Sequence, residues 1–275
     1  MTMNGKAAGG KVAYLGPEGS YSSLAARALC PAPWQGVPCN SFFAALELLE
    51  SGRADAAVLP VENTLQGAVT QNLDLLYAHE DLYAVREYLL PVEHCLIGKE
   101  GARLADIRRV FSHEQAILQC GKFLAGELPA AELVRTRSTA ESVLHVESVH
   151  DAAIAGAHMC EGGLAVLTGN IADEKKNFTH FLLVKRGREA LPSHSSRVYF
   201  AASCPHEPGA LLKMLQILAV YDLNMTRIES RPIKNRPGEY CFFIEFEGDA
   251  ADEGVSAALA RLAQYAKDFK LLGLY

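Results

Sequence analysis

A hydroxyl and an imidazole are neighbours at Thr179 and His180, within the sequence Asn-Phe-Thr-His-Phe of residues 177–181. This segment lies between a charged run, residues 173–176, and the apolar residues 181–184, which have the pattern of a buried strand. We therefore expect both side chains at the mouth of a strand, where they could handle a proton beside a bound substrate. The segment alone is more simply explained as a strand start with a structural threonine, because polar residues are common at such positions.

Serine hydroxyls and a glycine turn lie together at the first predicted strand. Residues 11–15 form this strand, and the turn Gly-Pro-Glu-Gly at 16–19 precedes a helix that begins around Ser20 and Ser22. Backbone N–H groups and hydroxyls at a helix start can bind an anion. The serines can equally well cap the helix, and the Gly-Lys-Ser/Thr ending of a P-loop is missing, so both explanations stay open.

A carboxylate, an amide and a hydroxyl follow one another at the end of the next apolar strand. This strand is predicted at residues 54–61, after a helix at 42–50, and it ends in Glu62, Asn63 and Thr64. Open α/β sheets bind ligands at the carboxyl ends of their strands. The three side chains are therefore candidates for contact with a substrate.

Two later strand ends also carry polar groups. Ser112 begins a helix after one strand, and Gln119 lies on the same face of that helix, seven residues on. Ser138 and Thr139 begin a helix after the following strand, in a pattern that a capping box explains. Recurring junctions of this kind predict two α/β lobes that face each other. The expected ligand is a small anion with more than one carboxylate.

The composition is that of an ordinary globular protein, with 275 residues of which 49% are hydrophobic and 21% charged, enough for about two domains. The net charge of −6 provides no basic field for nucleic acid or an anionic membrane. Residues 1–11 lack the apolar region of a secretory signal, and no apolar run is long enough to span a bilayer. Seven scattered cysteines without a CxxC pair indicate reduced thiols in a cytoplasm.

Two other kinds of site are disfavoured. The histidine, aspartate and cysteine residues between positions 145 and 160 match no standard zinc spacing, and solvated helix faces explain them better. The sequence has no Gly-x-Ser-x-Gly element of a hydrolase nucleophile. We therefore expect neither a metal site nor a serine hydrolase triad.

The pattern changes after a basic, serine-containing linker at residues 185–196. Residues 197–275 predict strand, helix, strand, strand, helix and strand in that order. The βαββαβ order is typical of a ferredoxin-like α+β unit.

Taken together, seven ordered segments resemble prephenate dehydratases that carry a C-terminal ACT regulatory domain. The resemblance extends over nearly the whole chain, from about Val12 to Tyr275, and its specificity comes from the full ordered set. The segments are residues 14–22, 60–67, 112–120, 138–140 and 177–181 in the catalytic part, and residues 209–212 and 229–232 in the ACT part.

The resemblance implies a two-lobed α/β catalytic domain at residues 11–188, similar to periplasmic binding proteins, with the active site between the lobes. The lobes are expected at residues 11–90 plus 171–188 and at 91–170, and the ACT domain at 197–275. The implied reaction is the decarboxylating dehydration of prephenate to phenylpyruvate in L-phenylalanine biosynthesis, a carbon–oxygen lyase activity. No metal or cofactor is expected, because aromatisation drives the step and the protein must mainly orient the dianion.

The resemblance also implies roles for individual residues. The family assigns departure of the ring hydroxyl to a threonine that corresponds to Thr179, which would act as a weak general acid. The catalytic candidates are Thr179, His180, Phe181, Asn63, Ser112 and Gln119. The substrate-binding candidates are Ser20, Ser22, Glu62, Thr64, Ser138, Thr139 and Asn177.

One position departs from the family. The motif normally reads Thr-Arg-Phe, whereas this chain has Thr-His-Phe, so His180 replaces a permanent forked cation by a smaller ring. If His180 contacts a substrate carboxylate, it must be protonated to act fully, and substrate binding should weaken as the pH rises.

For the ACT domain, the resemblance implies feedback inhibition by L-phenylalanine and a homodimer or homotetramer formed through ACT domains. The expected effector contacts are Gly209, Ala210, Leu211, Leu212, Asn224, Glu229, Ser230, Arg231 and Pro232. Three alternatives remain: an arogenate dehydratase, which runs the same chemistry on the aminated substrate, a non-aromatising prephenate decarboxylase, and a non-catalytic amino-acid sensor.

Overall fold

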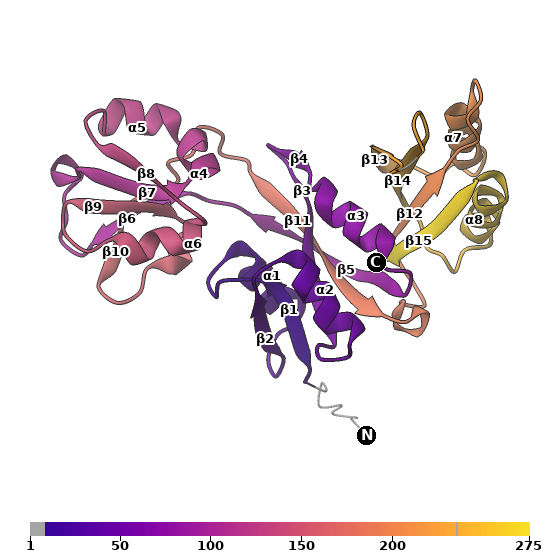
Figure 1. The fold of residues 1–275 in the computed structure, drawn as a ribbon, viewed down its shortest axis with the longest axis horizontal. Coiled ribbons are helices and arrows are strands. Elements are labelled where there is room, and N and C mark those ends of the chain that lie inside the picture. Colours follow the sequence, from indigo (N-terminus) through magenta and orange to yellow (C-terminus); the bar gives the residue numbers. More distant parts are fainter. Residues whose placement is uncertain (1–8, 235) are drawn as a thin grey trace.

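Two β-sheets organise the described part of this computed structural model, residues 9–234 and 236–275 (Figure 1). The larger sheet has ten strands in the order β13-β14-β12-β15-β5-β11-β3-β1-β2, with β4 paired to β3. The smaller sheet has the order β10-β6-β9-β7-β8. The molecule therefore has three parts in a row: a five-stranded lobe, a central lobe, and a C-terminal unit whose strands continue the central sheet (Figure 1).

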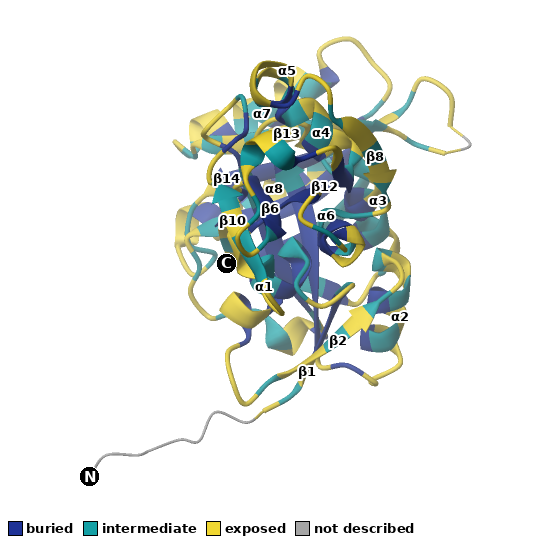
Figure 2. Cartoon of the chain, turned by 90° about the vertical axis from the view of Figure 1, so that its left-hand side faces the viewer, coloured by how far each residue is buried: buried dark blue, intermediate teal, exposed yellow. Residues whose placement is uncertain are grey.

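The central lobe is a sheet covered on both faces. Its strands are β1 (Lys11–Leu15), β2 (Gln35–Cys39), β3 (Ala56–Asn63), β4 (Gly67–Ala68), β5 (Leu82–Pro91) and β11 (Phe178–Arg186). Its helices are α1 (Tyr21–Leu29), α2 (Phe42–Glu50) and α3 (Thr70–Ala78). Leu29 of α1 packs on one face of the sheet, and Leu46 of α2 and Leu73 of α3 pack on the other. Burial on both faces explains why β3 and β11 are nearly continuous apolar runs. Figure 2 shows buried strands, in dark blue, in the interior of the molecule.

The five-stranded lobe is inserted between β5 and β11. Its strands are β6 (Cys95–Lys99), β7 (Arg109–His113), β8 (Glu132–Thr136), β9 (Asp151–Ala155) and β10 (Leu164–Thr168). Its helices are α4 (Glu114–Gln119), α5 (Gly121–Glu127) and α6 (Thr139–Ser142). The chain therefore crosses between the lobes twice, after β5 and before β11 (Figure 1).

The C-terminal unit has the predicted βαββαβ order. Its elements are β12 (Arg197–Ser203), α7 (Ala210–Val220), β13 (Met225–Pro232), β14 (Tyr240–Glu247), α8 (Glu253–Tyr265) and β15 (Asp268–Leu274). The strand order β13-β14-β12-β15 is that of a ferredoxin-like unit. Both helices pack on one face of the sheet, where Phe200 and Leu262 are buried. Tyr199 and Leu272 on the other face share a core with Leu73 of α3, so this helix-free face is closed by the central lobe.

The sequence did not predict strands β2 and β9, and it predicted one helix where the structure has two. β2 contains a glycine and a proline and lies at an edge of the sheet, where both residues are tolerated but give a weak strand signal. β9 is short, rich in alanine and completely buried, so it shows no alternation. The single helix expected from Ser112 through Cys120 begins only at Glu114, because Ser112 still belongs to β7, so Ser112 and Gln119 do not share a helix face. The helical segment is also divided into α4 and α5, which meet at Cys120.

In the described residues, no helix combines the length and apolar character that a membrane crossing needs. All seven cysteines are free thiols in this structure. The expected cytoplasmic location stays a prediction.

Candidate active site

A cavity of about 280 Å³ lies between the two lobes. The central lobe contributes Tyr21, Asn63, Gln66, Asn177 and Thr179 to its wall. Residues on the first crossing and in the five-stranded lobe complete it: Val92, His94, His113, Gln115, Ala116, Gln119, Arg137, Ser138 and Thr139. Polar side chains from several strand ends therefore meet at one place, as the recurring strand-to-helix junctions predict.

Asn63 and Thr179 are opposite each other in the antiparallel pairing of β3 with β11. Oδ1 of Asn63 accepts hydrogen bonds from the backbone N–H groups of Leu65 and Gln66, at 3.0 and 3.2 Å, which orients the amide nitrogen toward β11. This nitrogen lies 3.0 Å from Oγ1 of Thr179 and 2.8 Å from Oδ1 of Asn177. Because the threonine oxygen accepts a hydrogen from the amide, its own hydrogen is free for an acceptor in the cavity.

His94 and Gln119 form a second polar pair in the wall. Nε2 of His94 lies 2.8 Å from Oε1 of Gln119, and the imidazole is only 3% exposed. Burial lowers the pKa of His94, so the ring is uncharged at neutral pH and Nε2 carries the hydrogen that the amide oxygen accepts. Nδ1 then has no hydrogen-bond partner among the described residues. The pairing leaves the Gln119 amide nitrogen as a donor at the cavity.

The segment that starts α6 supplies the cation. Oγ of Ser138 accepts a hydrogen bond from the backbone N–H of Glu141 at 3.0 Å, and Oε2 of Glu141 accepts one from the backbone N–H of Arg137 at 3.0 Å. These bonds hold Arg137 at the cavity wall beside Ser138 and Thr139. A guanidinium there is a permanent positive charge that suits a carboxylate.

Several wall residues were absent from the sequence-based set. They are Tyr21, Gln66, Val92, His94, His113, Gln115, Ala116 and Arg137. Arg137 directly precedes the predicted capping box, and a cation beside capping hydroxyls was a usable signal. His94 follows Glu93 in an otherwise apolar crossing segment, where these two polar residues also stand out. The Tyr21 hydroxyl donates to the Glu93 carbonyl at 2.7 Å, and burial raises its pKa, so it stays protonated.

His180 does not line the cavity, which corrects the expected contact with a substrate carboxylate. Successive side chains of a strand point to opposite faces, so Thr179 faces the cleft and His180 faces the C-terminal unit. There Nδ1 lies 2.7 Å from Arg227 and Nε2 lies 2.8 Å from Glu87. Glu62, the partner of His180 in the ladder, also points away from the cleft and pairs with Arg227 at 2.5 Å.

Ser112 and Phe181 are internal rather than part of the wall. The Ser112 hydroxyl is fully buried and donates to the Ile154 carbonyl at 2.7 Å, which ties β7 to β9. Phe181 is buried against Val12 and Tyr14 in the central core. Both residues support strands near the cavity and have no surface toward it.

The hydroxyls expected at other helix starts are also used inside the protein. Oγ of Ser20 accepts from the backbone N–H of Ser23 at 3.2 Å and donates to the Leu15 carbonyl at 2.9 Å, so it caps α1. Ser22 is buried within α1. Oγ1 of Thr64 accepts from the backbone N–H of Phe178 at 2.9 Å. For Ser20, capping is the explanation that holds in this structure.

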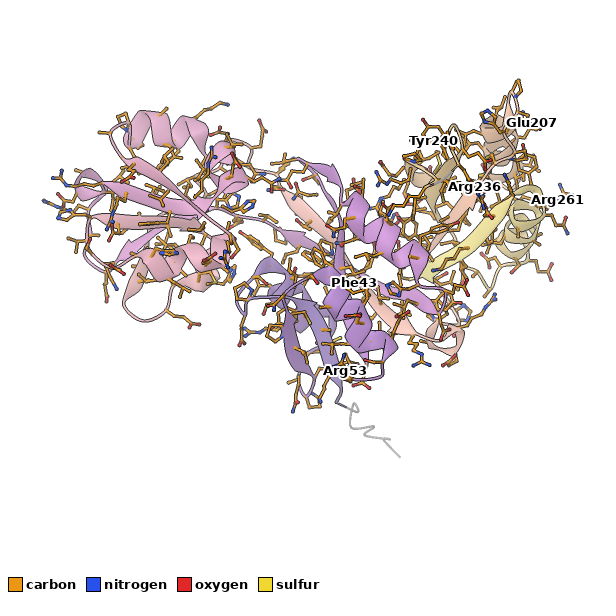
Figure 3. The ribbon with its side chains drawn as sticks, viewed as in Figure 1. Phe43, Arg53, Glu207, Arg236, Tyr240 and Arg261 are labelled. Carbon is orange, nitrogen blue, oxygen red and sulfur yellow. The ribbon has the colours of Figure 1, made fainter. Side chains whose placement is uncertain are left out.

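The residues expected to contact an effector lie in the C-terminal unit. Gly209 precedes α7 with a φ of 78°, and Ala210 and Leu211 line a second cavity of about 170 Å³. Glu207 and Tyr240 complete part of its wall, at the end of the molecule remote from the five-stranded lobe (Figure 3).

The other expected effector contacts lie outside that second cavity. Leu212 is 60% exposed, and the amide of Asn224 donates to Glu247 at 2.9 Å. Glu229, Ser230, Arg231 and Pro232 form the end of β13. Arg231 is paired with Asp74 of α3 at 2.8 Å, so this residue contacts the central lobe.

A family model described as "PDT: Prephenate dehydratase" matches residues 12–189. The chain belongs to the prephenate dehydratase family. The matched residues include both lobes, the whole cavity wall and the five catalytic segments, so the resemblance to prephenate dehydratases is confirmed. The ACT domain, with its two segments beyond residue 189, stays a prediction. The chain is accordingly an enzyme of the lyase class, a dehydratase.

Relatives of this prephenate dehydratase family member are named for two substrates, prephenate and arogenate. The chain is 36% identical over 269 residues to "Prephenate dehydratase" of Amycolatopsis methanolica, with 96% of this chain and 88% of the relative covered. It is 35% identical over 279 residues to "Arogenate dehydratase/prephenate dehydratase 2, chloroplastic" of Arabidopsis thaliana, with 96% and 72% covered. The names leave the choice between the two substrates open.

Two solved structures share the fold over nearly the whole chain. A prephenate dehydratase from Arthrobacter aurescens in complex with L-Phe is 34% identical with a TM-score of 0.86, and the match covers 96% of this chain and 88% of that one. GqqA, described as a novel type of quorum quenching acylase, is 32% identical with a TM-score of 0.85, and the match covers 96% of both chains.

Proposed function

We propose that this protein converts prephenate to phenylpyruvate, carbon dioxide and water, with Thr179 assisting the departure of the ring hydroxyl. The hydrogen bond from Asn63 to Thr179 carries the proposal, because it directs the threonine hydrogen toward the cavity. The ring carboxylate leaves as carbon dioxide, its bonding electrons enter the ring, and the ring C–O bond breaks. The departing oxygen takes up one proton to become water, and aromatisation drives both bond cleavages.

The remaining wall residues suit a dianionic substrate. Arg137 offers a permanent cation, and Ser138, Thr139 and the Gln119 amide offer neutral donors around it. Since the buried His94 is uncharged, it adds no second fixed charge to the cavity. These groups would hold the carboxylates in place while the Thr179 hydroxyl donates a hydrogen bond to the departing ring oxygen.

The deciding experiment incubates the purified protein with prephenate and, separately, with arogenate. Appearance of phenylpyruvate from prephenate supports the proposal, and faster formation of phenylalanine from arogenate would instead favour the arogenate dehydratase alternative. The relative named for both activities gives that alternative its support. Absence of either product would favour the non-catalytic sensor.

An acylase activity is less well supported by the cavity. Hydrolysis of an acyl group by a hydroxyl nucleophile requires an adjacent base. The Thr179 oxygen accepts from an amide, the Ser138 oxygen accepts from a backbone N–H, and the Tyr21 hydroxyl donates to a carbonyl. Among the described residues, none of these three hydroxyls forms a hydrogen bond with an imidazole. The arrangement therefore favours dehydration over acyl transfer.

We further propose that the C-terminal unit is an ACT domain that binds L-phenylalanine and inhibits the enzyme. The solved relative with bound L-Phe supports this, as do the ferredoxin-like order and the small cavity beside Leu211. Because β13 lies at an edge of the sheet, its free side can pair with a second copy, and we expect a dimer or tetramer formed there.

Calorimetry with L-phenylalanine and with D-phenylalanine tests effector binding, and sedimentation tests assembly. Tyr240→Ala should weaken binding of L-phenylalanine without changing basal turnover, whereas Phe43→Ala removes an equally exposed aromatic ring from α2 and should leave binding unchanged (Figure 3). No heat of binding to the wild-type protein at millimolar L-phenylalanine would end the regulatory proposal.

A further inference from the structure

Arg227 of the C-terminal unit contacts β3 and β11 on the face opposite to the cavity. These two strands carry the proposed catalytic pair, Asn63 and Thr179. In the ladder of β3 and β11, Asn63 is opposite Thr179, and the adjacent pair is Glu62 with His180. Neighbouring side chains point to opposite faces, so the first pair faces the cavity and the second faces Arg227. Nη2 of Arg227 lies 2.5 Å from Oε2 of Glu62 and 2.7 Å from Nδ1 of His180.

The contact with Arg227 decides which nitrogen of His180 carries the hydrogen. A guanidinium has donors only, so Nδ1 of His180 must accept, and the hydrogen of the neutral ring lies on Nε2. That nitrogen is 2.8 Å from Oε2 of Glu87, and the interaction with His180 lowers the pKa of Glu87. The imidazole therefore occupies a defined position between a cation on one side and a carboxylate on the other.

Arg227 is also fixed from the side of the C-terminal unit. Its side chain is 11% exposed, and its guanidinium carbon lies 5.9 Å from the centroid of the Tyr199 ring. Burial opposes the charge, but Glu245, Tyr199 and Glu62 outweigh it and raise the pKa of Arg227. A buried cation whose partners lie on both sides resists displacement, because losing a partner leaves charge unpaired.

We propose that Arg227 is a positioning residue for Asn63 and Thr179. The guanidinium restrains both Glu62, which precedes Asn63, and His180, which follows Thr179. Because Arg227 is part of β13, the distance between the Asn63 and Thr179 side chains depends on the position of that strand. The pairing of β3 with β11 becomes irregular directly after His180, and a ladder interrupted there gains more from an external restraint. The inference rests on the proposed function, since it assumes that Thr179 acts on the substrate.

The same strand carries the expected effector segment. Arg227, Glu229 and Arg231 alternate along β13 and are partly buried, whereas the residues between them are exposed. Both arginines contact the central lobe. Arg227 contacts Glu62 and His180, and Arg231 makes hydrogen bonds of 2.8 and 3.1 Å to Asp74 of α3. A ligand that shifts β13 would therefore act on the catalytic pair through Arg227.

The test measures kcat, KM for prephenate and melting temperature in the full-length chain. Arg227→Met and Arg227→Lys are each made in the wild-type and in a Thr179→Ala background. Arg227→Met should lower kcat roughly tenfold with a smaller change in KM, and Arg227→Lys should recover part of the loss. In the Thr179→Ala background, Arg227→Met should have no further effect on kcat, because the arginine acts through that threonine.

A matched control is Arg261→Met, which removes an arginine from α8 of the same unit, where its guanidinium lies over Tyr221 (Figure 3). This control should leave kcat unchanged. If Arg227→Met does not fold, Glu62→Gln removes one partner of the same ion pair, and the same comparison between backgrounds applies.

The outcomes separate the inference from the proposed function. A lower melting temperature with unchanged kcat in Arg227→Met, beside an impaired Thr179→Ala, overturns the positioning role alone. An equal loss of kcat in both backgrounds also overturns it. Wild-type turnover in Thr179→Ala would end the role of Thr179 and, with it, this inference.

Discussion

Asn63 donates a hydrogen bond of 3.0 Å to Thr179 from the neighbouring strand, and the Asn63 amide is itself oriented by two backbone N–H groups. The direction of this bond matters more than its strength. An amide nitrogen in this position makes the threonine oxygen an acceptor and leaves the threonine hydrogen for an acceptor in the cavity. A carboxylate oxygen in the same place would take that hydrogen instead.

Asn63→Asp should therefore impair turnover as strongly as Thr179→Ala, although it changes only one atom of the side chain. We expect both variants to lower kcat by roughly a hundredfold, the scale of one acid group. Thr179→Ser keeps the hydroxyl and should retain most activity. Steady-state kinetics with prephenate and circular dichroism of each variant check this, and near-wild-type turnover in Thr179→Ala would contradict the assignment.

Arg137→Met should raise KM for prephenate roughly tenfold or more, because a charged hydrogen bond to a carboxylate is lost. The KM of the wild-type enzyme should also rise with ionic strength, and that dependence should shrink in the variant. The matched control is Arg135→Met, since Arg135 lies two residues earlier and forms an exposed ion pair with Glu114. An unchanged KM in Arg137→Met would show that this cation does not bind the substrate.

His94→Phe should lower kcat/KM roughly tenfold, because the Gln119 amide loses the imidazole that orients it. Acid stability should change as well. The pKa of His94 lies below its ordinary value of 6.5, so the unfolded chain takes up the proton first as the pH falls, and stability is lost below about pH 6.5.

Melting temperatures of the wild type and of His94→Gln between pH 7 and pH 5 measure the His94 effect. The variant should lose less stability over this range. His150→Gln is the control, since His150 lies at the surface, where its Nδ1 is 2.8 Å from the Asp106 carbonyl oxygen. Equal acid losses in the wild type and His94→Gln would contradict the prediction.

Lys270→Met should destabilise the contact between the C-terminal unit and the central lobe. Nζ of Lys270 lies 2.7, 3.1 and 2.5 Å from the carbonyl oxygens of Leu76, Tyr77 and His79, where α3 ends. Without the lysine, these terminal carbonyls lose their donor, at a cost of about 2 kcal/mol.

Urea unfolding checks the size of the Lys270 effect. Lys267→Met is the comparison, because Lys267 forms an exposed ion pair with Glu239 and should change the free energy of unfolding by less than about 1 kcal/mol. Equal effects of the two variants would show that the helix end does not depend on Lys270.

Glu245→Gln should flatten the loss of stability in acid. Burial favours the neutral acid, but Arg227, Thr226 and Tyr275 favour the carboxylate more and lower the pKa of Glu245 below its ordinary 4.5. A lowered pKa contributes stability that is present above about pH 4.5 and is lost as the pH falls through the folded-state value. The melting temperature of the wild type should therefore fall more steeply below pH 4.5 than that of the variant. Parallel curves would contradict the prediction.

The sequence by itself determined the elements and their order. Ser41 and Ser138 mark helix starts, because their side chains accept hydrogen bonds from backbone N–H groups of the first turn. Apolar runs such as those in β3 and β11 identify buried strands. The βαββαβ pattern of the C-terminal unit needs only the spacing of apolar residues and turns. These signals are local, so they survive without knowledge of the rest of the fold.

Tertiary structure alone decided which polar residues meet. Thr179 and His180 are adjacent in one motif, yet strand alternation places one at the cavity between the lobes and the other 2.7 Å from an arginine of the C-terminal unit. Ser112 and Gln119 share one motif as well, but the first is used to bond β7 to β9. Arg137 and His94 come from segments far apart in the chain, and the folding of the five-stranded lobe brings both to the same cavity wall. Those distances depend on long-range strand pairing, which no local pattern encodes.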